Sequence, residues 1–264
     1  MRGYPFLAAI AKRRTSILRA VLLVCCCAVV VAARGQSETE DALAKSIVEK
    51  ADEARFPKDA FEVTVSITST LEDGGTEARK YRILSKGNEN TIVMALEPAS
   101  ERGQALLMKG HDLWIFMPSI SQPVRLSLSQ RLTGEVANGD LARANLAGDY
   151  AAKVLRTENV DGEPMYVLEL TAVERGVTYH RVVYWVRQAN SRPYKAEFYS
   201  LSDKLLKTCH YQEYRQLAGR MRPTRLVMED ALNAGEKSVL EYRDMRLRDL
   251  PDKMFTKDYL KHLD

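Results

Sequence analysis

The residues best able to do chemistry are four histidines, and they lie too far apart for a catalytic or zinc-binding motif. No two of them have the spacing of HExxH or HxxxH, and no cysteine pair accompanies them. They are His111, His180, His210 and His262. The chain also lacks a G-x-S-x-G elbow, a P-loop and a G-x-G-x-x-G motif. We therefore expect no metal, no cofactor and no enzymatic activity. A lipid hydrolase whose residues meet only in the folded chain is the less favoured alternative.

Cysteine usage gives little support to thiol chemistry. Cys25, Cys26 and Cys27 stand together near the N-terminus, and Cys209 is alone in the rest of the chain. No intrachain disulfide can form beyond the N-terminal segment, so the fold must depend on its apolar core. We expect Cys209 to be a small buried apolar group rather than a nucleophile.

The N-terminal segment has the pattern of an export signal. Residues 1–35 hold six basic residues and no acidic one, and Ala20–Ala33 is an uncharged apolar run. We expect cleavage after Ala33 or Gly35, which leaves residues 36–264 as one exported domain. A retained anchor, acylation at the three N-terminal cysteines and twin-arginine rather than Sec export remain open alternatives.

The charge of the remaining chain argues against a nucleic-acid ligand. The whole chain has a formal charge of +4, but residues 36–264 hold 33 basic and 35 acidic residues. This near-neutral body is not typical of proteins that bind the phosphate backbone.

The apolar pattern predicts a mainly β fold with few helices. A capping box at Ser37 and Glu40 and helical spacing afterwards predict a helix near 38–55, which Pro57 ends. The pattern then changes to period two, with turn residues between short segments and no helix between most pairs, as in an antiparallel meander. Strands are expected near 61–67, 76–85, 90–97, 104–109, 112–117, 122–127, 150–157, 164–173, 177–187, 193–200, 205–214, 223–230 and 237–247. Short helices are expected near 138–147 and 255–263.

Several strands are apolar on both faces, so both faces are covered or one of them lines a cavity. Filled core and hollow barrel are alternatives that the pattern does not separate. The candidates for a cavity lining are Trp114, Phe116, Tyr166, Leu168, Leu170, Tyr179, Val183 and Trp185.

Charged residues gather around the interruption between the two groups of strands. Arg125, Arg131 and Asp140 are candidates for a polar rim, at which arginine could meet a phosphate or carboxylate head group. The alternative is a set of exposed or cross-paired charges on a loop.

One stretch carries a family resemblance. Glu97-Pro98-Ala99-Ser100-Glu101-Arg102-Gly103-Gln104 leads into Asp112-Leu113-Trp114-Ile115-Phe116-Met117-Pro118, followed by Gln130-Arg131-Leu132-Thr133-Gly134 and Asp140. Further matches are Tyr179-His180-Arg181, Arg222-Pro223 and Leu250-Pro251-Asp252. This order resembles the outer membrane lipoprotein-sorting proteins, a LolA-like branch of the LolA/LolB carrier superfamily.

The resemblance implies a single half-open antiparallel β-barrel of about eleven strands with a helical lid near 38–55 and 138–147. It also implies a periplasmic carrier that holds the acyl chains of a lipoprotein or lipid for transfer toward the outer membrane. Expected partners are the acylated cargo and an inner-membrane exporter (permease), with transient membrane contact and an open oligomeric state. A non-enzymatic accessory or scaffold subunit of an envelope exporter is the alternative.

Overall fold

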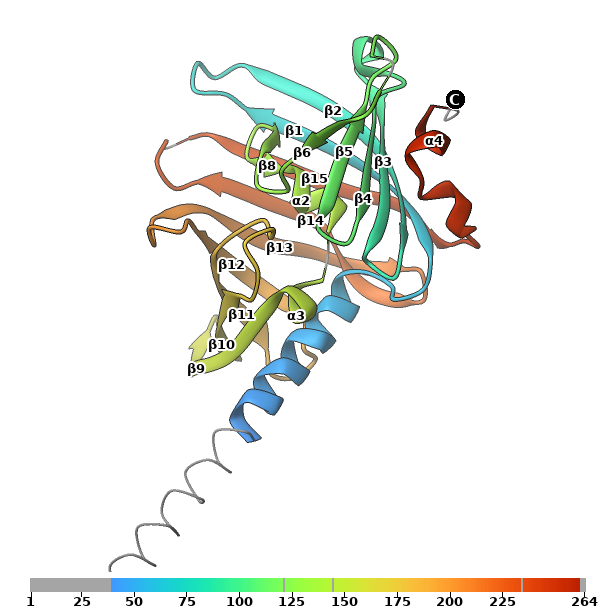
Figure 1. Cartoon of the computed structure of the whole chain (residues 1–264). Helices are drawn as coiled ribbons and strands as arrows, with labels where there is room; N and C mark the ends of the chain where they lie inside the picture. Colours follow the sequence, from blue (N-terminus) through green and yellow to red (C-terminus); the bar gives the residue numbers. More distant parts are fainter. Residues whose placement is uncertain (1–38, 121, 144, 234, 262–264) are drawn as a thin grey trace, which may run out of the picture. The chain divides into compact units, whose positions relative to one another are not determined.

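The computed structural model describes residues 39–120, 122–143, 145–233 and 235–261 (Figure 1). The chain divides into two compact units, Met1–Leu43 and Ala44–Asp264. Residues 39–43 of the first unit are helical, and residues 44–55 of the second are helical as well. The predicted export signal, 1–35, lies outside the described residues. Within the described ranges no helix is both long and apolar enough to span a membrane.

The second unit is built on one antiparallel sheet. Its strand order is β6-β5-β4-β3-β2-β1-β15-β14-β13-β12-β11-β10-β9. Strands that follow one another in the chain pair within β1 to β6 and within β9 to β15, and the pairing of β1 with β15 joins these two groups. Six strands come before residue 130: β1 (Phe61–Thr70), β2 (Thr76–Lys86), β3 (Asn90–Glu97), β4 (Ala105–Lys109), β5 (Asp112–Phe116) and β6 (Val124–Leu126). Seven follow: β9 (Tyr150–Val160), β10 (Glu163–Ala172), β11 (Arg181–Arg187), β12 (Pro193–Tyr199), β13 (Leu205–Leu217), β14 (Arg220–Asp230) and β15 (Lys237–Leu247).

The mainly β class and the antiparallel meander are confirmed, but the count of about eleven strands that the family resemblance implies is wrong. Thirteen strands form the sheet, one for each segment that the alternation predicts. The strand expected over 177–187 starts only at Arg181. Among the described residues the end strands β6 and β9 do not pair, so the sheet is open, as in a half-open barrel.

Period-two alternation places the main core on the inner face of this sheet. Val63, Val65 and Ile67 of β1 are buried there, and Ala44, Val48 and Ala51 of the 44–55 helix belong to the same cluster. An apolar stripe on a helix and one face of a sheet thus bury each other.

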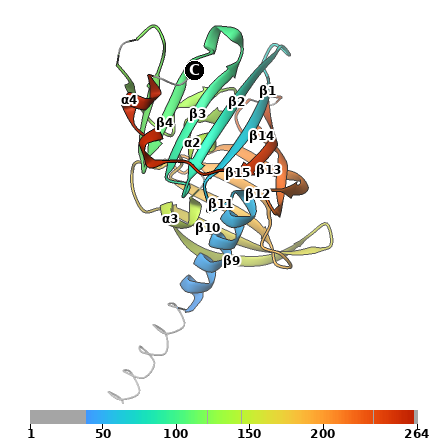
Figure 2. The ribbon, with the colours of Figure 1, turned by 90° about the vertical axis from the view of Figure 1, so that its right-hand side faces the viewer.

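The outer face of β2 to β5 is covered by the C-terminal segment. This segment contains a 3-10 turn, η2 (Asp252–Met254), and a short helix, α4 (Lys257–Leu260), which Figure 2 shows beside β4. Its residues Leu250, Phe255 and Leu260 are buried in a second cluster with residues of β2 to β5. Another 3-10 turn, η1 (Ala99–Glu101), connects β3 to β4.

The segment between β6 and β9 is an insertion on the inner side of the sheet (Figure 1). It holds a small hairpin, β7 (Arg131–Thr133) and β8 (Val136–Ala137), and two short helices, α2 (Asn138–Ala142) and α3 (Leu146–Asp149). One helix was expected over 138–147, but the chain is extended at Arg143, so the helix is broken in two. Helix α2 contacts β2, β3 and β4.

Gly134 allows the β7–β8 hairpin to pack closely against the sheet. Gly134 has a φ of +47°, and a Cβ at this position would lie 2.1 Å from the Ser69 Oγ. The Ser69 and Ser238 hydroxyls are 2.8 Å apart, and the Glu135 N–H donates to the Ser238 Oγ at 2.9 Å. Close approach of this kind suits glycine, which carries no side chain.

Candidate functional site

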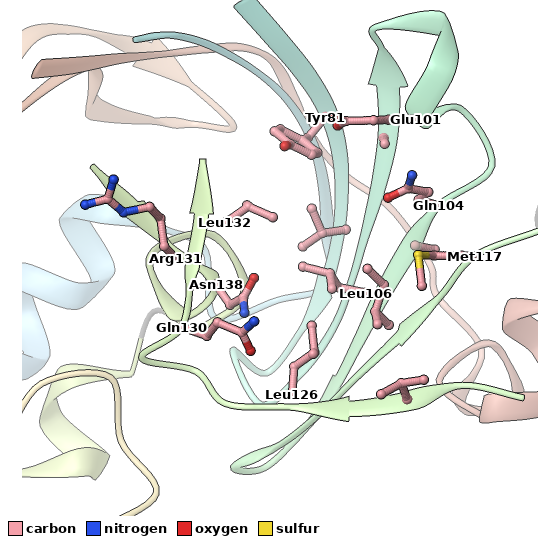
Figure 3. Close-up of a pocket in the computed structure, with 15 residues that line it drawn as sticks. Tyr81, Glu101, Gln104, Leu106, Met117, Leu126, Gln130, Arg131, Leu132 and Asn138 are labelled. Carbon is pink, nitrogen blue, oxygen red and sulfur yellow. The ribbon is translucent and has the colours of Figure 1, made fainter. Parts of the chain in front are cut away.

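A pocket of about 340 Å³ opens between the inner face of β2 to β6 and the β7–β8 hairpin (Figure 3). The sheet supplies most of its apolar wall, and β7 supplies Leu132 from the opposite side. Apolar lining residues include Val93, Leu106, Ile115, Met117, Leu126 and Leu132. Pockets that hold small ligands have this size and this mostly apolar character.

Polar side chains surround the pocket. Tyr81, Glu101 and Gln104 come from the sheet side, whereas Gln130, Arg131 and Asn138 come from the insertion. These residues are shown in Figure 3. The Arg79 Nε donates to the Glu101 carboxylate at 3.2 Å. Burial, and next the Glu101 charge, raise the pKa of Tyr81 to about 12. The Tyr81 hydroxyl therefore stays protonated at neutral pH and is available as a hydrogen-bond donor.

A buried charge cluster attaches the insertion to the sheet. The Lys207 ammonium of β13 donates to the Asp140 Oδ2 of α2 at 2.8 Å and also to the Glu135 carbonyl oxygen. The Tyr179 hydroxyl donates to the same carboxylate at 2.8 Å. Both charged side chains are only 6% exposed. We call Asp140, Tyr179 and Lys207 the Asp140 cluster. Removal of one partner of such a buried, hydrogen-bonded ion pair strongly destabilises the folded protein.

Further polar contacts hold α3 and the residues before it. The Arg143 guanidinium pairs with the Asp149 carboxylate and donates to the Gly110 carbonyl at 2.9 Å. His111 lies 2.9 Å from the same carboxylate. The Ala147 N–H donates to the Asp52 carboxylate of the 44–55 helix at 2.8 Å. The insertion is therefore tied to the sheet and to this helix by polar contacts, while its apolar residues face the pocket and core.

Comparison with solved structures decides the family. A LolA superfamily protein from Nitrosomonas europaea is 64% identical, with a TM-score of 0.79, and the match covers 82% of this chain and 98% of that one. The chain belongs to the LolA superfamily. This confirms the resemblance to the outer membrane lipoprotein-sorting proteins.

Two more distant structures share the LolA superfamily fold. One is a Vibrio parahaemolyticus domain described as an outer membrane lipoprotein-sorting protein, and the other is a DUF1329 family protein from Desulfovibrio piger. Each is 22% identical with a TM-score of 0.72, and each match covers 84% of this chain and 99% of the other. A family model described only as "-like: Uncharacterized protein" matches residues 87–262. No curated protein matches the chain.

In this LolA superfamily chain the eight cavity candidates divide between the two faces of the sheet. Tyr166, Leu168, Leu170 and Tyr179 belong to the inner cluster, where ligand contact stays a prediction. The side chains of the other four candidates lie on the outer face, because successive residues of a strand point to opposite faces of the sheet. Trp114 and Phe116 lie in the cluster under the C-terminal segment, and Val183 and Trp185 lie in a third cluster on the outer face. None of the eight lines the pocket in Figure 3.

The three rim candidates also have different surroundings. Arg131 lines the pocket, Asp140 is buried in the Asp140 cluster, and Arg125 is exposed and pairs with Asp112. Sequence reasoning missed Tyr81 and Leu132. The alternation of 76–85 could have placed Tyr81 on one face with Ile83, but only the fold shows which face is the inner one.

Three carboxylates meet beside the Asp140 cluster. Ligand atoms of Glu135, Asp230 and Glu236 lie within 4.8 Å of one another, which makes them the group that could hold a cation in the described part of the chain. Glu135 is buried, and Arg131 lies 3.8 Å from it. Burial, and next Asp230, raise the pKa of Glu135 to about 7. Despite burial, the Asn233 and Leu232 N–H groups lower the pKa of Asp230, so Glu135 rather than Asp230 takes up a proton as the pH falls through about 7.

This arrangement predicts a pH-dependent stability. The pKa of Glu135 in the folded chain is above its ordinary value of 4.5, so its stabilisation is complete below that value and is lost as the pH rises through about 7. Between these pH values we expect the free energy of unfolding to fall by on the order of 2 kcal/mol. Glu135→Gln should make this slope shallower in urea titrations at several pH values, and the part that remains belongs to other groups such as Asp52, whose pKa burial also raises to about 7. An equal slope in the variant and the unaltered chain contradicts the prediction.

Proposed function

We propose that this protein is a non-enzymatic periplasmic carrier that binds an acyl chain of a lipid or lipoprotein in the pocket beneath the β7–β8 hairpin. The observation that carries this proposal is an apolar pocket of about 340 Å³ inside an open sheet, in a chain of the LolA superfamily. An exposed acyl chain is unfavourable in water by about 0.8 kcal/mol per CH₂. Binding in such a pocket removes that penalty without any covalent chemistry.

The insertion has the features of a lid. It covers the pocket from one side, and its polar attachments at Asp140, Asp149 and Asp52 are separate from the apolar wall. Movement of the hairpin and α2 away from the sheet would open the pocket. A receiver that binds the cargo more tightly would then complete the transfer.

The route of the cargo follows from the sequence predictions. The N-terminal residues 1–35 support export to the periplasm, and the family supports transfer toward the outer membrane. An inner-membrane exporter that delivers the acylated cargo is part of this proposal. The protein needs only transient contact with either membrane.

Extraction of bound lipid tests the carrier function. The full chain, expressed with its own N-terminus and purified from the periplasmic fraction without detergent, should carry an acylated molecule in native mass spectrometry. Leu132→Glu should reduce occupancy more than tenfold, because a carboxylate in an apolar pocket is poorly solvated.

The matched control is Leu201→Glu. Leu201 is 80% exposed, does not line the pocket, and should keep normal occupancy when changed. An empty unaltered protein, or equal occupancy in the two variants, contradicts the proposal. Circular dichroism identifies any variant that has lost its fold.

A further inference from the structure

We infer that the pocket selects a single acyl chain whose head is an uncharged hydrogen-bond acceptor, an ester or amide carbonyl, and that the Tyr81 hydroxyl recognises this carbonyl. The inference rests on the proposed function and adds the class of ligand. It is carried by a tyrosine hydroxyl that is open to the pocket and has no hydrogen-bond partner in the described part of the chain, by the charges around it and by the volume of the pocket.

The Tyr81 hydroxyl lacks a partner in the described part of the chain. Tyr81 is 4% exposed, and in Figure 3 its ring projects from β2 over the pocket, with the hydroxyl on the side of Leu132. The ring is buried, but the hydroxyl oxygen is accessible from the pocket, where it is free to donate a hydrogen bond. A ligand acceptor in the pocket would receive this hydrogen bond.

The charges near Tyr81 argue against an anionic head group. The Glu101 carboxylate lines the same end of the pocket, and the nearby Arg79 guanidinium already pairs with it. An anionic head group of a ligand, a carboxylate or a phosphate, would be repelled by the Glu101 carboxylate and would find no unpaired cation beside it among the described lining residues. The guanidinium of Arg131 points away from the pocket in Figure 3. A neutral carbonyl accepts from Tyr81 without this repulsion.

Gln104 can complete the recognition of an ester or amide. Its side chain lines the same pocket, between Glu101 and Met117 in Figure 3, and its amide has no hydrogen-bond partner within the described ranges. An amide both donates and accepts. It can therefore bind the second polar atom of such a head group, an amide N–H or a neighbouring hydroxyl.

The volume of the pocket suits one acyl chain. About 340 Å³ is within the range of pockets that hold a single small ligand. We therefore expect the head group and part of one medium-length acyl chain to occupy it.

Calorimetric titration of the full chain, after extraction of bound lipid, tests the inference at neutral pH. The probes are monodecanoin, an uncharged ester, and decanoate, which has the same chain and an anionic head. We expect monodecanoin to bind at least tenfold more tightly. Tyr81→Phe should weaken monodecanoin binding by about five- to tenfold, the loss of one hydrogen bond, with little effect on decanoate.

The matched control is Tyr242→Phe. Tyr242 is also 4% exposed on the inner face but does not line the pocket, so its change should leave both affinities unaltered. Equal affinity for the two probes, or no effect of Tyr81→Phe on the ester, overturns the inference and leaves the carrier function in place. Failure of both probes to bind, together with the absence of any extracted lipid, overturns the carrier function itself. The preference of the unaltered chain tests the inference even where a variant does not fold.

Discussion

Lys207→Met is expected to lower the free energy of unfolding by about 3–5 kcal/mol. The change removes the cation of the Asp140 cluster and leaves a carboxylate that is only 6% exposed without its charged partner. It also removes the donor to the Glu135 carbonyl, so both the hairpin and α2 lose a contact with β13. Urea unfolding followed by circular dichroism measures the effect.

The control for this change is Lys204→Met, at an exposed position just before β13. Its effect should stay within about 0.5 kcal/mol. Adding Asp140→Asn to Lys207→Met should recover part of the loss, because the buried charge is then gone, and the coupling in this double-mutant cycle should exceed about 1 kcal/mol. Additive effects would show that the two side chains do not stabilise each other.

Phe255→Ala is expected to reduce stability by a similar amount, about 3–5 kcal/mol. Phe255 is buried in the cluster that joins the C-terminal segment to the outer face of β2 to β5. Its removal leaves a cavity in the cluster against which Trp114 packs, so tryptophan fluorescence should shift to longer wavelength. Thermal and urea unfolding give the loss of stability.

The same variant separates the two faces of the sheet. The pocket that we propose to hold the acyl chain lies on the inner face, so folded Phe255→Ala protein should keep its ligand occupancy. Met254→Ala, at a half-buried position in the same segment, should cost less than half as much stability. A loss of ligand in folded Phe255→Ala protein would mean that the outer cluster takes part in binding.

Alternation was enough to predict the strands. Each of the thirteen expected segments corresponds to a strand of the sheet, and the turn residues between them mark its hairpins. Alternation also separated Leu113 and Ile115 from Trp114 and Phe116. It did not show which set faces inward, because the C-terminal segment makes the outer face of β5 nearly as apolar as the inner face.

The candidate site was harder to predict because its parts are distant in the chain. Lys207 lies 67 residues from Asp140, and no local pattern connects β13 with α2. Tyr81 and Leu132 face each other only after the insertion has returned to the inner side of the sheet. Asp140 was noted as a charge in an interruption, yet its burial depends on partners that a single sequence does not indicate.

The open sheet has a mechanical consequence. Because β6 and β9 are not joined in the described structure, the sheet can change its curvature without breaking any hydrogen bond between neighbouring strands. A closed barrel would have to rupture a ladder to widen. The space inside the sheet can therefore widen around a larger ligand when the insertion moves away. The free edge at β9 carries the charged residues Lys153, Arg156 and Glu158, and these disfavour pairing with a strand of a second chain.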